Sequence, residues 1–347
     1  MNNIRLYDYQ IEMKERIEAA FRSCRSVMVQ MPTGTGKTHV LTSVVTDEVQ
    51  RAKNACVWIV AHRRELVEQI EASLVCQSGL ACSDFQSSFI KVMSIQWLSK
   101  HYGELDEKPS LIVIDEAHHA LARTYAEVMN AYPEAKKLGV TATPCRLNLK
   151  GFSDLFDVLL QSWPTKKFIA DGRLSLYDYM SIKADSEDQR MVFGLTKRGA
   201  DGDFSLKEMS EKLDVRPSIE RLCDTVLRYA PDKKGITYAI DVKHAEHIAE
   251  YYREHGIPAV AISWKTPVDE RKRIVEEFKR SGDSAEKGDV SSGAVRVLVN
   301  VDLFGEGFDC PDVEFIQLAR PTLSLAKYLQ QVGRGMRVFD GKKYCLI

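Results

Sequence analysis

The chain has 347 residues, of which 44% are hydrophobic and 28% charged, a composition that excludes collagen, coiled coils and disordered chains. At roughly 150 residues a domain, this length predicts about two domains. The 48 basic and 49 acidic residues leave a formal net charge of -1, so no global basic field indicates a polyanionic partner, although one groove of a neutral protein can still be basic.

The cysteines and the start of the chain predict a cytoplasmic protein. The eight cysteines contain no C-x-x-C pair, which argues against a zinc site and a disulfide framework and favours reduced thiols. The first ten residues lack the apolar region of a signal peptide. The longest apolar run, 55–61, is far shorter than the roughly 18 residues of a membrane span, so no membrane partner is expected.

In the first half of the chain, short β-branched runs alternate with stretches whose apolar residues recur at helical spacing. Apolar residues at this spacing predict helices over 13–24 and 40–49. Strands are expected at 26–31, 55–61, 89–95, 111–115 and 137–141. Near-continuous apolar strands separated by helices are typical of a buried parallel sheet.

The pattern weakens between about 161 and 216, and we place a connection at 163–216 between a first domain, 1–162, and a second, 217–347. A helix after Pro217 resumes the alternation, followed by strands at 235–240, 258–263, 295–302 and 313–320. The Gly-, Ser- and Asp-rich segment 281–294 is expected to be a surface loop that tolerates shortening. Residues 344–347 begin a strand, which indicates either a domain cut short or a very short edge strand.

A phosphate-binding loop is predicted directly after the strand 26–31. Met31-Pro-Thr-Gly-Thr-Gly-Lys-Thr38 lies between a strand and a helix and departs from G-x-x-x-x-G-K-[ST] only at Met31. Backbone N–H groups of such a loop cradle phosphates, while Lys37 would reach the β and γ phosphates and the Thr38 hydroxyl would bind Mg²⁺. The residues expected at the nucleotide are Thr33, Gly34, Thr35, Gly36, Lys37 and Thr38.

Two carboxylates follow the next predicted buried strand, in Leu111-Ile-Val-Ile-Asp-Glu-Ala-His-His119. Asp115 can hold the Mg²⁺ that Thr38 also contacts, and Glu116 can act as the general base that polarises the attacking water. Acidic residues directly after a buried strand are common and do not by themselves indicate a catalytic site. Downstream of a phosphate loop they indicate a nucleoside triphosphatase.

With these two motifs the sequence resembles the superfamily 2 helicases and translocases, whose DEAH box matches Asp115-Glu-Ala-His118. Further motifs follow in the order of that family: Ia at 60–66, Ic at 92–96, III at 141–143, IV at 235–239, V at 299–309 and VI at 330–337. The resemblance covers nearly the whole chain. It implies an α/β fold of two tandem RecA-like P-loop NTPase domains, each with a parallel sheet flanked by helices.

Within this superfamily, Glu306-Gly-Phe-Asp309, Leu318-Ala-Arg-Pro-Thr322 and Gln330-Gln-Val-Gly-Arg-Gly-Met-Arg337 are similar to the bacterial RadD-type DNA repair helicases and to the motor modules of restriction enzymes. We favour the RadD type. Tyr7 departs from the family, which usually has a basic residue there, and the loop 281–294 is longer than in relatives. The chain also ends where relatives continue, which leaves open the functions of that region.

The resemblance assigns roles to individual residues. Tyr7 would stack on the adenine of ATP and Gln10 would read it. Arg334 and Arg337 would complete the ATPase site from the second domain, because guanidinium groups present a planar fork to phosphate oxygens. The remaining assignments are Gln330 in catalysis, Gly307 and Asp309 at the nucleotide, and His118, Thr141 and Thr143 in coupling. A further set of polar residues lies at or just after strand ends, where side chains and backbone amides can contact the phosphates of nucleic acid: Arg63, Ser94, Gln96, Arg146, Lys243 and Asn300.

These observations predict an ATP-dependent helicase or translocase that uses ATP and Mg²⁺ and acts on DNA in repair or recombination. DNA is favoured over RNA. Two alternatives stay open: a restriction-type motor that translocates duplex DNA, and an ATP-gated clamp that holds DNA. A monomer is expected, with a single-strand-binding or repair protein as a candidate partner.

Overall fold

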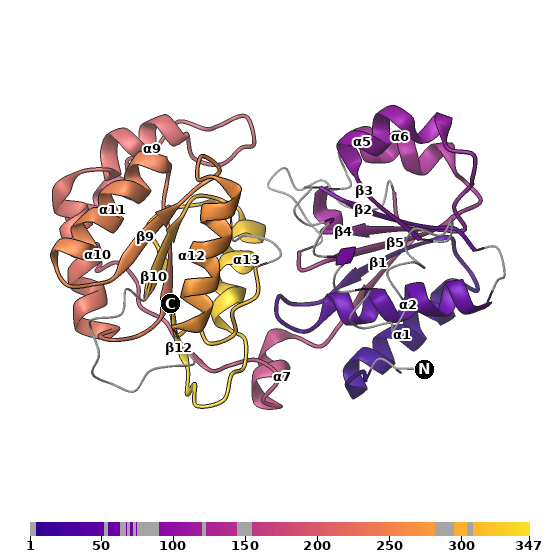
Figure 1. Ribbon diagram of the computed structural model, residues 1–347, viewed down its shortest axis with the longest axis horizontal. Helices are drawn as coiled ribbons and strands as arrows, with labels where there is room; N and C mark the ends of the chain where they lie inside the picture. Colours follow the sequence, from indigo (N-terminus) through magenta and orange to yellow (C-terminus); the bar gives the residue numbers. More distant parts are fainter. Residues whose placement is uncertain are drawn as a thin grey trace. The chain divides into compact units, whose positions relative to one another are not determined.

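The computed structural model describes residues 5–51, 55–62, 67, 70–71, 74, 90–119, 123–143, 155–281, 295–303 and 308–347. The chain divides into two compact units, residues 1–168 and 169–347 (Figure 1). Each unit contains a parallel β-sheet flanked by helices, which confirms the predicted fold class. Most of the expected loop 281–294 lies outside the described residues.

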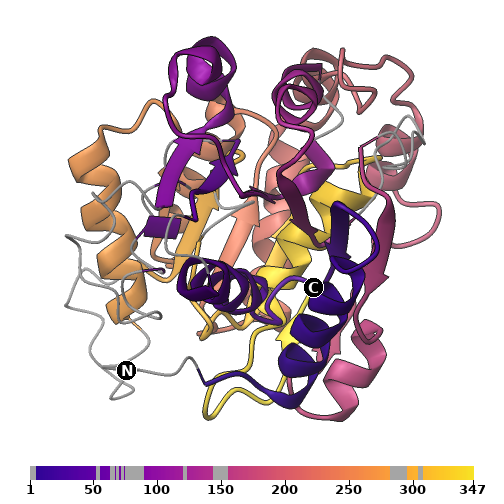
Figure 2. The ribbon, with the colours of Figure 1, turned by 90° about the vertical axis from the view of Figure 1, so that its right-hand side faces the viewer.

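The first sheet has six described strands in the order β3-β2-β4-β5-β1-β6. The strand bounds are β1 Ser26–Gln30, β2 Val57–Ala61, β3 Ile90–Ser94, β4 Leu111–Asp115, β5 Lys136–Thr141 and β6 Val158–Gln161. Helices α1 (Asp8–Ala20) and α2 (Lys37–Arg51) pack together on one face, and α5 (Ile95–His101) and α6 (Arg123–Ala131) cover the other (Figure 1, Figure 2). Short helical turns lie at η1 Tyr102–Glu104 and η2 Ala117–His119.

The central strands of this sheet are buried along nearly their whole length. Every residue of β2 is buried, as are all residues of β4 except Asp115. A strand covered by helices on both faces must be apolar on both faces, which explains why continuous apolar runs, rather than alternating ones, marked these strands. The polar residues Gln30 and Asp115 stand where strands end.

The second sheet has the order β7-β12-β11-β8-β10-β9. Its strands are β7 Tyr177–Asp178, β8 Gly235–Tyr238, β9 Ala259–Ile262, β10 Val297–Asn300, β11 Phe315–Leu318 and β12 Cys345–Leu346. The helices of this unit are α8 Glu187–Phe193, α9 Leu206–Leu213, α10 Arg216–Tyr229, α11 Val242–Glu254, α12 Val268–Arg280 and α13 Leu325–Gly335, and α7 Thr165–Ala170 spans the boundary between the units.

The segment 163–216, expected to be a connection, mostly belongs to the second unit. Strand β7 pairs with β12, and the residues around α8 and α9 form a small core with Ile240. The contact boundary falls after Phe168 instead. Strand β12 lies between β11 and β7 and is not an edge strand. Strand β7 and helices α8 and α9 escaped prediction because they are short and bury few apolar residues.

None of the helices in the described ranges has the length and apolar character needed to cross a membrane.

Candidate nucleotide site

Three neighbouring strands of the first sheet end at one edge, and each leads into a predicted motif. The register pairs Gln30 of β1 with Thr141 of β5, and Asp115 of β4 with Val140 of β5. The Met31 N–H donates to the Thr141 carbonyl at 3.0 Å. The phosphate loop, the two carboxylates and residues 141–143 therefore meet at the carboxyl end of the sheet, where open α/β sheets bind ligands.

The shape of the phosphate loop depends on its two glycines. Gly34 and Gly36 have φ values of 87° and 77°, in the left-handed region that favours glycine. A Cβ atom at Gly36 would also overlap the side-chain amide of Gln10. The Thr35 hydroxyl donates to the Pro32 carbonyl at 2.8 Å. The loop is thus held in a tight curve at the N-terminus of α2.

The residues of this loop fit a phosphate ligand. The Thr33 hydroxyl is buried and has no hydrogen-bond partner among the described residues, which is costly for a polar atom unless a ligand or water satisfies it. The N-terminus of α2 adds a partial positive charge. Lys37 Nζ lies 3.5 Å from the Met31 carbonyl, at the mouth of the loop. The half-buried Thr38 and Asp115 have the oxygen ligands that Mg²⁺ prefers.

Gln10 links the start of α1 to the phosphate loop. Its Oε1 accepts from the Tyr7 N–H at 2.9 Å, and its Nε2 donates to the Thr35 carbonyl at 3.1 Å. Tyr9 Oη donates to the same carbonyl at 3.1 Å. Gln10 is therefore a loop-positioning residue, a role that the sequence did not indicate. The Tyr7 ring is half exposed and stacked on Tyr9, and the adenine contacts of Tyr7 and Gln10 stay predictions.

A chain of close polar contacts connects the general-base candidate to the third motif. Glu116 is 8% exposed, and its Oε2 lies 3.3 Å from His118 Nδ1. The same nitrogen lies 3.1 Å from Thr141 Oγ1, which donates to the Thr143 carbonyl at 3.0 Å. Glu116 has φ 49°, a conformation rare outside glycine and often found at functional sites. The structure thus brings Glu116 together with the three residues predicted for coupling.

In the second unit, the two predicted arginines converge on one backbone segment. Arg334 is buried near the end of α13, and its guanidinium donates to the Phe308 carbonyl at 2.6 Å. Arg337 donates to the same carbonyl at 3.2 Å and forms an ion pair with Asp309. Gln330 is buried in α13. Asp309 thus holds Arg337 in this structure, whereas Gly307 lies outside the described residues.

Of the residues predicted to contact nucleic acid, some lie in the described part of the chain and others do not. Ser94 caps α5 by accepting from the Trp97 N–H at 3.3 Å, Gln96 Nε2 donates to the His62 carbonyl at 2.8 Å, and Lys243 is exposed in the first turn of α11. Arg63 and Arg146 lie outside the described residues.

Asn300 differs from the exposed residues of this set. Its side chain is fully buried, and its Nδ2 donates to the Thr237 carbonyl of β8 at 3.3 Å. This hydrogen bond joins β10 to β8, and a contact of Asn300 with nucleic acid stays a prediction.

Two cations of the second unit, one buried and one half-buried, had no sequence prediction. Arg320 is 4% exposed, and its NH1 lies 2.9 and 2.8 Å from the two carboxylate oxygens of Asp302, whose φ is 51°. Lys342 Nζ donates to backbone carbonyls at the end of α13. Neither set of contacts has a local sequence pattern, because the partners come together only when the chain folds.

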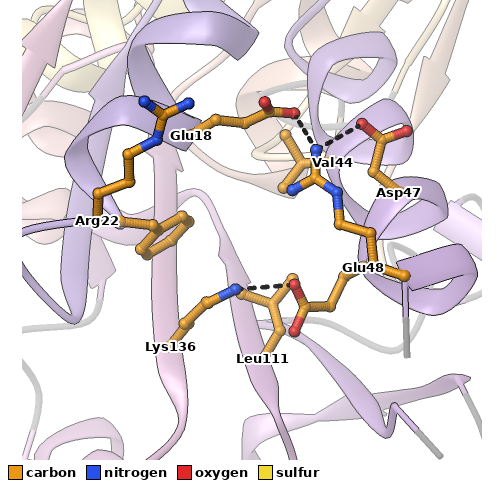
Figure 3. A pocket seen from close by; sticks show the side chains of 9 residues that line it. Glu18, Arg22, Val44, Asp47, Glu48, Leu111 and Lys136 are labelled. Carbon is orange, nitrogen blue, oxygen red and sulfur yellow. Dashed lines mark hydrogen bonds and ion pairs between the residues drawn. The ribbon is translucent and has the colours of Figure 1, made fainter. Parts of the chain in front are cut away.

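A cavity of about 260 Å³ lies elsewhere in the first unit (Figure 3). Leu111 and Lys136, the first residues of β4 and β5, form part of its wall, so it opens at the opposite end of the strands from the phosphate loop. Its charged side chains are largely paired: Arg51 with Glu18 at 2.9 Å, and Lys136 with Glu48 at 3.0 Å. It is not the nucleotide site.

Comparisons with known proteins assign both units. Residues 3–146 match the family "Type III restriction enzyme, res subunit", and residues 217–339 match "Helicase conserved C-terminal domain". A 51.5 kDa protein of Lactococcus phage (isolate 7-9) is 30% identical over 320 residues, which are 92% of this chain and 64% of that protein. "Putative ATP-dependent helicase IRC3" of Saccharomyces cerevisiae is 27% identical over 370 residues, which are 99% of this chain and 51% of that protein.

This chain therefore spans about half to two thirds of the length of these relatives. Among solved structures, the ATP-dependent Type ISP restriction-modification enzyme LlaBIII bound to DNA superposes with a TM-score of 0.72 at 16% identity, over 99% of this chain and 27% of that one. At this identity the likeness supports the fold alone. By its two matched domains and their motifs, this chain belongs to the superfamily 2 helicases.

Proposed function

We propose that this chain is the ATP-hydrolysing motor of a DNA helicase or translocase that acts in repair or recombination, as RadD-type helicases do. The observation that carries this proposal is the convergence of the phosphate loop, Asp115, Glu116 and residues 141–143 at one edge of the first sheet. The name of the IRC3 relative, an ATP-dependent helicase, and the DNA bound to LlaBIII support it.

Each residue of the first unit has a chemical task in this proposal. Lys37 would neutralise the β and γ phosphates of ATP, while Thr38 and Asp115 would hold Mg²⁺, which would supply further positive charge. The Glu116 carboxylate accepts a proton from the attacking water. Its contact with His118 fixes its direction and, through Thr141, joins it to the motif that would report hydrolysis to the rest of the domain.

The second unit would complete the reaction with Arg334 and Arg337, whose charges stabilise the phosphoryl group as negative charge develops on it. Because these arginines belong to a different unit from Lys37 and Glu116, full activity requires the two units to close around ATP. A nucleic-acid strand that binds both units can favour closure only by its higher affinity for the closed state than for the open one. Repeated closing and opening would move the chain along DNA.

A restriction-type motor that translocates duplex DNA is the second candidate. The match of residues 3–146 to the res subunit of type III restriction enzymes favours it. An ATP-gated clamp is less well supported, because Lys37, Asp115, Glu116 and Arg337 are all present and a clamp with slow turnover needs no such complete set. RNA also stays an outcome to test, because backbone contacts distinguish it from DNA only through the 2′-hydroxyl.

Strand displacement from a forked duplex, measured in parallel with displacement of a third strand from a triplex, distinguishes these functions. A helicase releases the fork strand when ATP is hydrolysed. A duplex translocase displaces the triplex strand and leaves the duplex intact. ATP turnover without either displacement would leave only the clamp.

The Glu116→Gln variant should bind ATP and hydrolyse it about 10²- to 10⁴-fold more slowly, the usual contribution of a general base. Glutamine preserves the shape of the side chain and removes its proton-accepting carboxylate. Nucleotide affinity and single-turnover hydrolysis, measured on the same preparation, check this. Normal hydrolysis by this variant would show that another group activates the water.

Nucleic-acid binding should weaken steeply with salt, because each phosphate contact releases counterions. A tract with about four such contacts loses roughly 10²-fold in affinity between 50 and 200 mM salt. Fluorescence anisotropy with a labelled oligonucleotide measures this slope. Affinity that stays flat over that range would contradict a groove that binds the phosphate backbone.

A further inference from the structure

The half-buried Lys342 joins the two backbone segments that carry the arginine pair. Its Nζ donates to the carbonyls of Gly335 at 2.6 Å, Arg337 at 2.9 Å and Pro311 at 3.2 Å. An ammonium group has three N–H donors and no acceptor, so these carbonyls use its full capacity. The Gly335 carbonyl lies at the end of α13 and the Arg337 carbonyl just after it, whereas Pro311 follows the segment 308–310.

The position of this ammonium suits its charge. The last carbonyls of a helix lack partners within the helix and carry a partial negative charge, and α13 ends at Gly335. After that helix the chain turns back, with the Lys342 N–H donating to the Phe339 carbonyl at 3.1 Å. The pKa of Lys342 is lowered, mainly because the ammonium is buried, while nearby Asp312 and Glu314 oppose this shift. The three acceptors also favour the charged form.

The side chains of Arg334 and Arg337 contact the segment that precedes Pro311. Both guanidinium groups donate to the Phe308 carbonyl, and Arg337 also pairs with Asp309. Lys342 binds the carbonyl of Pro311, directly after this segment, and the carbonyl of Arg337 itself. These hydrogen bonds therefore connect Arg337 at both ends: Lys342 binds its backbone carbonyl, and residues 308–309 bind its guanidinium.

We propose that Lys342 is a positioning residue for Arg337: by clamping the segment 308–311 against the end of α13, it fixes where the Arg337 guanidinium is presented. This inference rests on the proposed ATP-hydrolysing function. Lys342 contacts no reacting atom in this account and acts on the reaction through Arg337.

Lys342→Met removes the charge and the three donors while it keeps an unbranched side chain. We expect the variant to fold and to retain ATP affinity, and its nucleic-acid-stimulated kcat to fall by about 10²-fold, the loss that a displacement near 1 Å of a catalytic group can cause. Lys343→Met is the matched control, because Lys343 is the next residue and is exposed. It should behave as the wild type.

A double-mutant cycle separates positioning from general support of the fold. Lys342→Met added to Arg337→Ala should cost little further turnover, because the group that Lys342 positions is already absent. Equal fold losses in the presence and absence of Arg337 would overturn the proposal.

If thermal denaturation shows that Lys342→Met is unfolded, Lys342→Arg, which keeps the charge and the donors, should restore folding and part of kcat. Full kcat in a folded Lys342→Gln would also overturn the proposal.

The same series separates this inference from the proposed function. A wild type without ATP turnover, or an Arg337→Ala variant as active as the wild type, would contradict the proposed function and this inference with it. Normal behaviour of those two proteins together with full activity of Lys342→Met would contradict the inference alone.

Discussion

The Lys37→Ala variant should lose ATP hydrolysis and stay folded. Lys37 is half buried at the first position of α2, with its Nζ 3.5 Å from the Met31 carbonyl at the edge of the sheet, so its removal leaves the apolar core intact. Loss of one preorganised charged donor costs on the order of 10²- to 10³-fold in rate, and loss of phosphate affinity adds to this. ATP turnover and the thermal unfolding midpoint, measured together, check both parts.

An exposed lysine of the same unit provides the control. Lys108 precedes β4, at the end of the strands opposite to the phosphate loop, and Lys108→Ala should leave turnover unchanged. Unchanged hydrolysis in a folded Lys37→Ala protein would remove the phosphate loop from the mechanism.

The Arg337→Ala variant should keep its ATP affinity and lose most nucleic-acid-stimulated turnover, on the order of 10³-fold if the arginine engages fully. In the proposed function the first unit binds most of the nucleotide, whereas Arg337 belongs to the second unit. Arg334→Ala should behave similarly, although Arg334 is buried against the Phe308 carbonyl and its loss can also disturb α13. Arg228→Ala, in α10 of the same unit, is the control.

Nucleotide affinity and stimulated turnover must be measured on one preparation of each variant. Lost ATP affinity with intact stimulation would mean that the second unit binds the ground-state nucleotide and that Arg337 does not act on the transition state.

The sequence was sufficient for the parts of the fold that rest on continuous patterns. Strand β2 is apolar throughout, and β1, β4 and β5 are apolar except at their ends, because helices cover both faces of the sheet. The phosphate loop has a fixed spacing of glycines before Lys37. Strand β7 offered no such pattern: it has two residues, both exposed, and exists because it pairs with β12. Pairing between distant segments leaves no local periodicity to read.

The same limit applies to the site. The sequence identified the motif residues, but it could not show that Gln10 hydrogen-bonds the phosphate loop or that Lys342 caps α13. It also assigned Asn300 to a ligand on the ground that polar residues follow strands. In the structure Asn300 is the last residue of β10, where the neighbouring strand β8 supplies its partner. Polar character at a strand end thus predicts a hydrogen bond but does not decide whether a ligand or the backbone receives it.

If nucleic acid controls ATP hydrolysis by this chain, the steady-state ATPase rate must depend on which nucleic acid is present. With single-stranded DNA, duplex DNA and RNA compared side by side, we expect slow hydrolysis by the protein alone, strong stimulation by at least one form of DNA and weaker stimulation by RNA, with Lys37→Ala inactive throughout. A rate that is the same with and without every nucleic acid would show that nucleic acid does not control hydrolysis.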